Sequence, residues 1–201
     1  MTASKSIRQK IASLPRNEPF TPALFVGLGS RAAIDQTLMR LTREGEIERV
    51  SRGVYVRPRP TAFGFNAKPT AEQVARAIAK AENATIEIQG AEAARRFGFS
   101  TQMPTQPVYL TSGSSRRLQL GRLRLTLKHV SPRKLALAGT KAGPAMSALW
   151  YLGKSEVSER TFAQLARQMP PDAFRTLSAN KAAMPSWMSS ALTRYENRTD
   201  A

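Results

Sequence analysis

Cysteine is absent from the 201 residues, and histidine occurs once, at position 129. Without cysteine the chain can form no disulfide, thiolate metal site or cysteine nucleophile. One histidine cannot build a histidine cluster for a metal, and a serine–histidine–aspartate arrangement would have to use His129 with a distant acid. We therefore expect no metal and no cofactor, and we expect His129 to be a hydrogen-bonded or exposed residue of a sheet. The lack of cysteine also suits a reducing compartment, which predicts a cytoplasmic protein.

Long apolar runs are missing as well. No uninterrupted stretch approaches the roughly 20 residues that a membrane helix needs. Residues 1–14 lack the apolar core of a signal peptide. We therefore expect a protein that is neither exported nor membrane-bound.

Acidic residues are few, with 14 against 31 lysines and arginines, a formal net charge of +17 and a pI near 11.3. No acid lies between Glu92 and Glu156, where eleven basic residues fall. Such a field favours nucleic acid as partner, although it could equally dock an acidic protein. Gly113-Ser114 resembles the start of a nucleotidyltransferase site, but metal-dependent transfer needs carboxylates that this region lacks. The sequence thus predicts that the chain is not an enzyme.

Residues 30–57 predict a helix followed by a hairpin. Apolar residues recur at four- and three-residue spacing, which places them on one helical stripe: Ile34, Leu38 and Leu41. Ser30 can cap the start of this helix, and Gly45 can end it in a left-handed conformation. Ile47 and Val50, then Val54-Tyr55-Val56 after Gly53, read as two short strands around a turn.

The preceding residues predict two more helices. Residues 4–14 carry an apolar stripe, and Thr21 can cap a second helix with Pro22 at its first position. Phe20 and Phe25 have the spacing of a hydrophobic staple. Gly27–Gly29 would make the tight turn into the third helix. Three helices and a basic hairpin predict a winged helix-turn-helix, a fold that places one helix in the major groove of DNA.

The rest of the chain predicts an α+β fold with three parts: the winged helix-turn-helix domain at 1–58, a linker at 59–69, and a basic domain at 70–201. Thr70 can cap a helix, and a short strand, a short helix at 90–97 and another strand should follow. Residues 116–130 alternate around Gly121 as a hairpin with one apolar and one basic face. Four helical patterns complete a domain with a small mixed sheet and a helical tail, at 144–152, 158–169, 171–178 and 185–195. Within them, Trp150, Tyr151 and Trp187 should anchor a core or an interface.

Two sets of residues are candidates for binding an anion. Arginine can pair with guanine and glutamine with adenine, while hairpin cations suit the phosphate backbone. Tyr55 can donate its hydroxyl to a phosphate, but packing of its ring on the first helix is the favoured interpretation. Gly53 should serve the turn itself. The predicted DNA-binding residues are Ser30, Arg31, Gln36, Arg40, Arg43, Arg49, Arg52, Tyr55 and Arg57. The second basic patch comprises Arg116, Arg117, Arg122, Arg124, Lys128, Arg133 and Lys134.

The block from Ser30 to Pro58, above all Arg49-Val50-Ser51-Arg52-Gly53-Val54-Tyr55-Val56-Arg57-Pro58, resembles the AbiEi family of antitoxins from type IV toxin–antitoxin systems. The likeness continues into the basic second domain. It implies a winged domain that binds double-stranded DNA at inverted repeats in its own promoter. It also implies a second domain associated with antitoxin activity, and a cognate nucleotidyltransferase toxin.

We therefore expect a DNA-binding antitoxin and transcriptional autorepressor of a toxin–antitoxin operon. The alternative is a basic winged-helix adaptor that binds protein or RNA and has no toxin partner, because winged helices also serve as docking platforms. The sequence leaves open the operator, the toxin and whether it is contacted directly, the oligomeric state, and whether the second basic patch binds DNA or protein.

Overall fold

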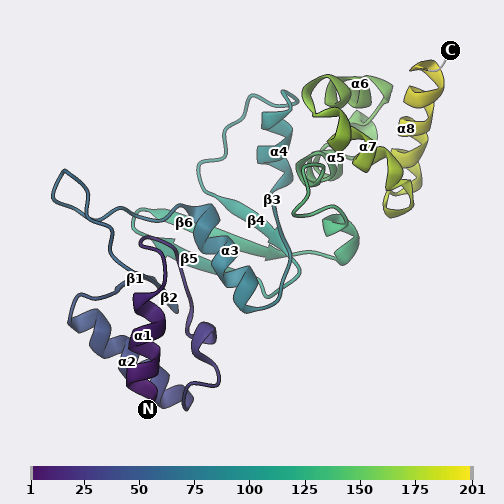
Figure 1. The fold of residues 1–201 in the computed structure, drawn as a ribbon. Helices are drawn as coiled ribbons and strands as arrows, with labels where there is room; N and C mark the ends of the chain where they lie inside the picture. Colours follow the sequence, from purple (N-terminus) through teal and green to yellow (C-terminus); the bar gives the residue numbers. More distant parts are fainter. Residues whose placement is uncertain (1, 200–201) are drawn as a thin grey trace. The chain divides into compact units, whose positions relative to one another are not determined.

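Two helices and a hairpin form the first part of the chain in the computed structural model, which describes residues 2–199. Helices α1 (Ala3–Ala12) and α2 (Arg31–Arg43) lie side by side, and strands β1 (Glu48–Ser51) and β2 (Val54–Val56) pair antiparallel (Figure 1). Their shared core consists of Ile7, Ile11, Phe20, Phe25, Ile34, Leu38, Leu41 and Ile47. The predicted stripe of α2 is therefore confirmed as the buried face of that helix.

Both ends of α2 follow their predicted chemistry. The Ser30 hydroxyl oxygen accepts a hydrogen bond from the amide of Ala33 at 3.3 Å, which satisfies one of the free donors of the first turn. Gly45 follows the helix with φ +74°, a conformation that costs glycine little.

The prediction of a second helix, capped by Thr21, is wrong. Only a single 3₁₀ turn forms, η1 (Pro22–Phe25), and Thr21 makes no side-chain capping bond. The left-handed Gly27, at φ +89°, follows too soon for an α-helical turn to propagate. The staple is nevertheless present, since the Phe20 and Phe25 rings meet edge to face with centroids 5.8 Å apart.

The stretch predicted as a linker contains a second short hairpin, Arg59–Ala67, which we call the finger. The amide of Ala67 donates to the carbonyl of Arg59 at 2.9 Å, and the amide of Thr61 donates to the carbonyl of Phe65 at 3.0 Å. Gly64 turns the chain at φ +78°. The sequence predicted only a linker here, whereas in the structure these residues form a turn.

A second sheet and the remaining helices follow. Helix α3 (Ala71–Ala81) begins with a capping box in which Thr70 and Gln73 bond each other's backbone amides. The sheet has the order β3-β4-β6-β5, with β3 antiparallel and β6 parallel to β4. Its strands are β3 (Ile86–Ile88), β4 (Val108–Thr111), β5 (Arg116–Leu120) and β6 (Leu123–His129). The hairpin at Gly121 is confirmed, although Leu123 is exposed rather than part of the apolar face.

Helix α4 (Gly90–Arg96) follows β3, and the chain ends in the predicted helical tail. The tail consists of η2 (Pro132–Leu135), α5 (Gly143–Glu156), α6 (Glu159–Gln168), α7 (Pro171–Ala179), η3 (Lys181–Ala183) and α8 (Ser186–Thr199). Helices α5 to α8 gather around one apolar core (Figure 1). Trp150 and Trp187 pack against that core with ring centroids 6.2 Å apart, whereas Tyr151 is about half exposed.

The described chain divides into two compact units. The first comprises Met1–Ala84 and Arg117–Leu125, and the second comprises Thr85–Arg116 and Thr126–Ala201. This division falls after α3 instead of within residues 59–69. The predicted boundary concerns which parts fold by themselves, so it stays a prediction. The α+β fold, with a winged helix-turn-helix arrangement at the N-terminus, is as predicted.

Candidate nucleic-acid interface

The outer face of α2 is open to solvent. It is formed by Ala32, Gln36, Met39 and Arg43, which lie opposite the buried stripe. No other side chain or carbonyl in residues 2–199 bonds Gln36 or Arg43, so their polar atoms are available to a ligand. Met39 is 50% exposed, and it adds an apolar contact between two polar ones.

Arg40 lies at the edge of this face and is partly engaged. Its guanidinium bonds the Ser4 hydroxyl of α1, and its Nε lies 3.8 Å from a carboxylate oxygen of Glu44. Glu44 also pairs with Arg8 at 2.5 Å. Since the Arg40 side chain keeps about half of its exposure, it can still reach a ligand, but only from a fixed position.

The first turn of α2 supplies two of the predicted DNA-binding residues. Arg31 pairs with Asp35 one turn later at 2.8 Å, and both side chains are exposed. Such surface pairs contribute little to stability and exchange readily for another anion. The Ser30 hydroxyl is already used as the helix cap, so only its exposed edge remains for a phosphate.

The wing presents two free cations. Glu48 faces Val56 and Arg49 faces Tyr55 in the strand register, with an irregularity before Ser51. Arg49 and Arg52 are exposed and bond no partner among the described residues. Gly53 turns the hairpin at φ +73°, as predicted. These arginines, together with the outer face of α2, form the candidate interface.

Two predicted residues serve the fold instead. The Arg57 guanidinium donates to the carbonyls of Ala12 and Leu14, at 2.7 and 2.5 Å, and so closes the C-terminal end of α1. The Tyr55 ring stacks on Phe20, which lies outside the first helix, with centroids 6.1 Å apart, and it packs against the core to which Ile7 and Ile11 of α1 belong. Neither residue therefore belongs to the set of side chains without partners, and their contact with DNA stays a prediction.

The residues of the second basic patch are divided between the two units. Arg117, Arg122 and Arg124 belong to the first unit and the other four residues to the second. Arg133 donates to the carbonyls of Ala183 and Met184, at 3.0 and 2.6 Å. The ammonium of Lys134 lies 5.3 Å from the centroid of the Trp150 ring. Two of the seven cations, Arg133 and Lys134, thus hold backbone and aromatic groups.

Two cations at the N-terminal end of the acid-free region, Arg95 and Arg96, are paired with an acid. Glu92 bonds Arg95 at 2.8 and 2.9 Å and Arg96 at 2.9 Å. These hydrogen bonds, with that of Arg95 the largest contribution, lower the pKa of Glu92 from 4.5 to about 2 against the opposing effect of its burial. Residues 92–96 therefore form a closed ion cluster on α4.

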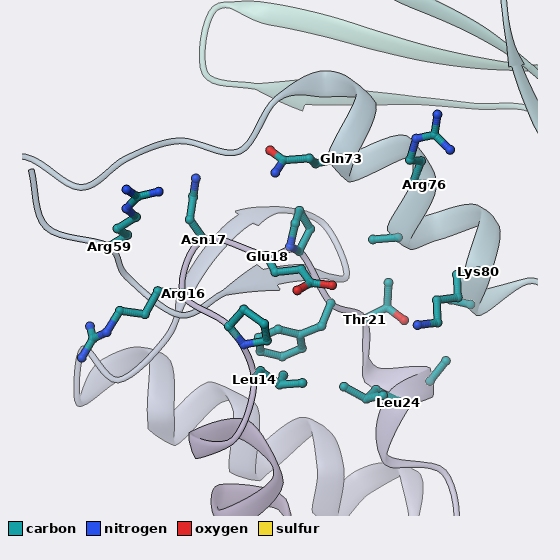
Figure 2. Close-up of a pocket in the computed structure, with 16 residues that line it drawn as sticks. Leu14, Arg16, Asn17, Glu18, Thr21, Leu24, Arg59, Gln73, Arg76 and Lys80 are labelled. Atoms are coloured by element: carbon teal, nitrogen blue, oxygen red, sulfur yellow. The ribbon is translucent and has the colours of Figure 1, made fainter. Parts of the chain in front are cut away.

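A pocket of about 650 Å³ lies in the first unit, between residues 14–24 and the helix α3. Figure 2 shows Lys80 reaching toward Thr21 and Glu18, whereas Arg76 points away from the space. Arg76 is moreover paired with Glu72. The charged residues of its lining are Glu18 and four cations, Arg16, Arg59, Arg76 and Lys80.

The remaining chemistry of the chain is sparse. His129 is exposed and its Nδ1 lies 2.9 Å from the carbonyl oxygen of Gly113, so it is the hydrogen-bonded sheet residue that was predicted. Within residues 2–199 no three histidine, aspartate or glutamate side chains gather to hold a metal ion. No helix of that part of the chain is both long and apolar enough to cross a membrane.

The fold and the candidate interface define an α+β protein whose N-terminal winged helix-turn-helix exposes a basic helix face and a basic hairpin. The chain belongs to the DUF6088 family, a family of unknown function, whose model matches residues 6–171. No curated protein and no solved structure matches it.

Proposed function

We propose that this protein is a DNA-binding antitoxin that represses its own operon, with the outer face of α2 in the major groove and the wing along the phosphate backbone. The observation that carries DNA binding is the set of partner-free side chains on one small fold: Gln36 and Arg43 on the helix, Arg49 and Arg52 on the hairpin. Three of the four are cations, and the fourth has the donor and acceptor pair that reads adenine.

The physical argument for DNA binding is that Arg43, Arg49 and Arg52 have no carboxylate partner among the described residues. Exposed guanidinium groups without a carboxylate repel one another, and phosphates would relieve that repulsion. Helix α2, which carries Gln36 and Arg43, packs on the core beneath it, so its outer face is preorganised. Acting on its own promoter places the protein in the cytoplasm.

The antitoxin part of the proposal rests on the resemblance of residues 30–58 to the AbiEi family. That resemblance suggests a nucleotidyltransferase toxin as the second partner and inverted repeats as the operator. A two-fold operator would require two copies of the chain on the DNA.

The decisive experiment measures binding of the purified protein to a duplex that spans its own promoter. We expect Arg43→Ala/Arg52→Ala to weaken binding by at least about tenfold, and to reduce the log–log salt slope by about 0.9 for each lost phosphate contact. The matched control is Arg160→Ala/Arg175→Ala, which removes the same charge from exposed positions of α6 and α7. Equal losses in the two variants would refute the assigned interface, because they would show only a response to net charge.

Repression and neutralisation need separate tests. A promoter–reporter fusion should be repressed by the parent and released by Arg43→Ala/Arg52→Ala. If a nucleotidyltransferase gene lies beside this one and its product arrests growth, co-expression of the two proteins should restore growth. If growth is not restored while repression holds, the protein is a repressor without antitoxin activity.

A further inference from the structure

The finger is an ordered structure that holds two aromatic rings in water. Phe63 is 82% and Phe65 62% exposed. Their rings are nearly parallel, with centroids 6.0 Å apart and an angle of 17° between their planes. Rings this exposed bury little apolar surface within the chain, so a core does not account for them.

Backbone and side-chain bonds fix the finger independently of its rings. The Thr61 hydroxyl donates to the Phe65 carbonyl at 2.7 Å, beside the backbone bond between the same residues. At its base, Asn66 bonds the Glu48 carboxylate, and Lys68 lies 3.7 Å from the same group. Since Glu48 belongs to β1, these contacts attach the finger to the wing.

The charges around the finger are positive. Arg59 at its base is exposed and has no partner within the described residues. The one carboxylate bonded to the finger, that of Glu48, is already matched by Asn66 and Lys68. Arg59, at the base of the finger, is therefore a cation without a bonded partner, and it also lines the pocket that contains Glu18.

We propose that the finger binds single-stranded nucleic acid by stacking Phe63 and Phe65 on unpaired bases, with Arg59 on the adjoining phosphate. Exposed aromatic rings beside a cation are the combination that such strands recognise, because every base offers a face for stacking. Entering an intact duplex would require base steps to be unstacked, whereas an unpaired strand presents its bases freely. This activity goes beyond the duplex binding proposed above and uses other residues.

The test measures the affinity of the full chain for a fluorescent oligothymidylate of about twelve nucleotides, by anisotropy at low salt. Replacing both rings, Phe63→Ala/Phe65→Ala, should weaken binding by about tenfold or more, since each stacked base contributes roughly 1–3 kcal/mol. The variant keeps every charge, so a general response to the basic surface is unchanged. The matched control is Met103→Ala, which removes another exposed apolar side chain, 74% exposed, from the second unit.

Two further variants separate stacking from apolar contact. Phe63→Trp/Phe65→Trp should bind at least as tightly as the parent, with tryptophan emission quenched on binding, whereas Phe63→Leu/Phe65→Leu should bind as weakly as the alanine variant. Full affinity in the alanine or the leucine variant would overturn the proposal. So would a loss confined to a blunt promoter duplex, which would place the finger in the duplex interface.

The outcome is independent of the proposed function. Suppose that the parent does not bind its promoter duplex but binds the oligothymidylate, and that Phe63→Ala/Phe65→Ala weakens this second binding. The repressor proposal then fails, and the finger remains a site for single strands. If Arg43→Ala/Arg52→Ala abolishes duplex binding and the alanine variant of the finger keeps the oligothymidylate, the reverse holds.

Discussion

The α2–wing surface and the second basic patch look alike in the sequence but differ in the structure. Gln36, Arg43, Arg49 and Arg52 point to solvent without partners, whereas Arg133 closes a turn of backbone and Lys134 covers a tryptophan. An orphan carbonyl or an aromatic face attracts a cation as a phosphate does. A basic residue without a nearby acid is therefore no evidence of an external anion until its neighbours are known.

Arg57 provides the test with the largest expected effect. It follows Arg49 and Arg52 closely in the sequence, but its guanidinium bonds backbone carbonyls of the chain. Replacing it by methionine keeps most of the side-chain volume but leaves the carbonyls of Ala12 and Leu14 without their donor. We expect the free energy of unfolding to fall by about 1–3 kcal/mol, measured by urea denaturation. Promoter affinity of the folded variant should drop no more than that of Arg160→Ala. A large loss of affinity with unchanged stability would place Arg57 in the interface.

Glu92 tests whether an acid within the chain holds two further cations, because its carboxylate bonds Arg95 and Arg96 of α4. Its folded pKa, about 2, lies below the ordinary 4.5, so the stabilisation is present above about pH 4.5 and is lost as the pH falls toward 2. Glu92→Gln should therefore lower the unfolding free energy at pH 7, by about 1 kcal/mol for a partly exposed group. Near pH 2 the two proteins should converge. A difference that stays constant from pH 7 to pH 2 would contradict the ion cluster.

Lys134 carries the smallest expected effect. Replacing it by glutamine removes the cation over Trp150 and should reduce stability by roughly 0.5–1 kcal/mol, with the tryptophan emission altered. Lys134→Arg should retain most of the stability. If Lys134→Gln instead weakens promoter binding as much as Arg43→Ala, the second basic patch is part of the interface after all.

Local rules predicted the helix–hairpin head well. The apolar stripe of α2, its serine cap, its glycine end and the staple of Phe20 on Phe25 each depend on residues within a few positions of one another. The same rules succeeded for the Thr70 cap of α3 and the turn at Gly121. Chemistry that a short segment determines by itself can be predicted from that segment.

Distant contacts could not be predicted. The bond from Arg57 to Leu14 spans 43 positions and that from Arg133 to Met184 spans 51, so no local pattern signals them. The hairpin of the finger was not predicted, because residues 59–69 were expected to be a linker, although Thr61 and Phe65, four residues apart around Gly64, are consistent with a hairpin. The two exposed rings were visible in the sequence, but not that they stack.

The attachment of the wing has a consequence for recognition kinetics. Arg57 fastens the end of β2 to α1, and Phe20 exchanges backbone bonds with Tyr55 at 2.8 and 2.9 Å. A hairpin held in this way has little conformational entropy left to lose when a ligand orders it. Encounters should therefore lead to a complex without a folding step, and association should be limited by diffusion and steering rather than by rearrangement of the wing.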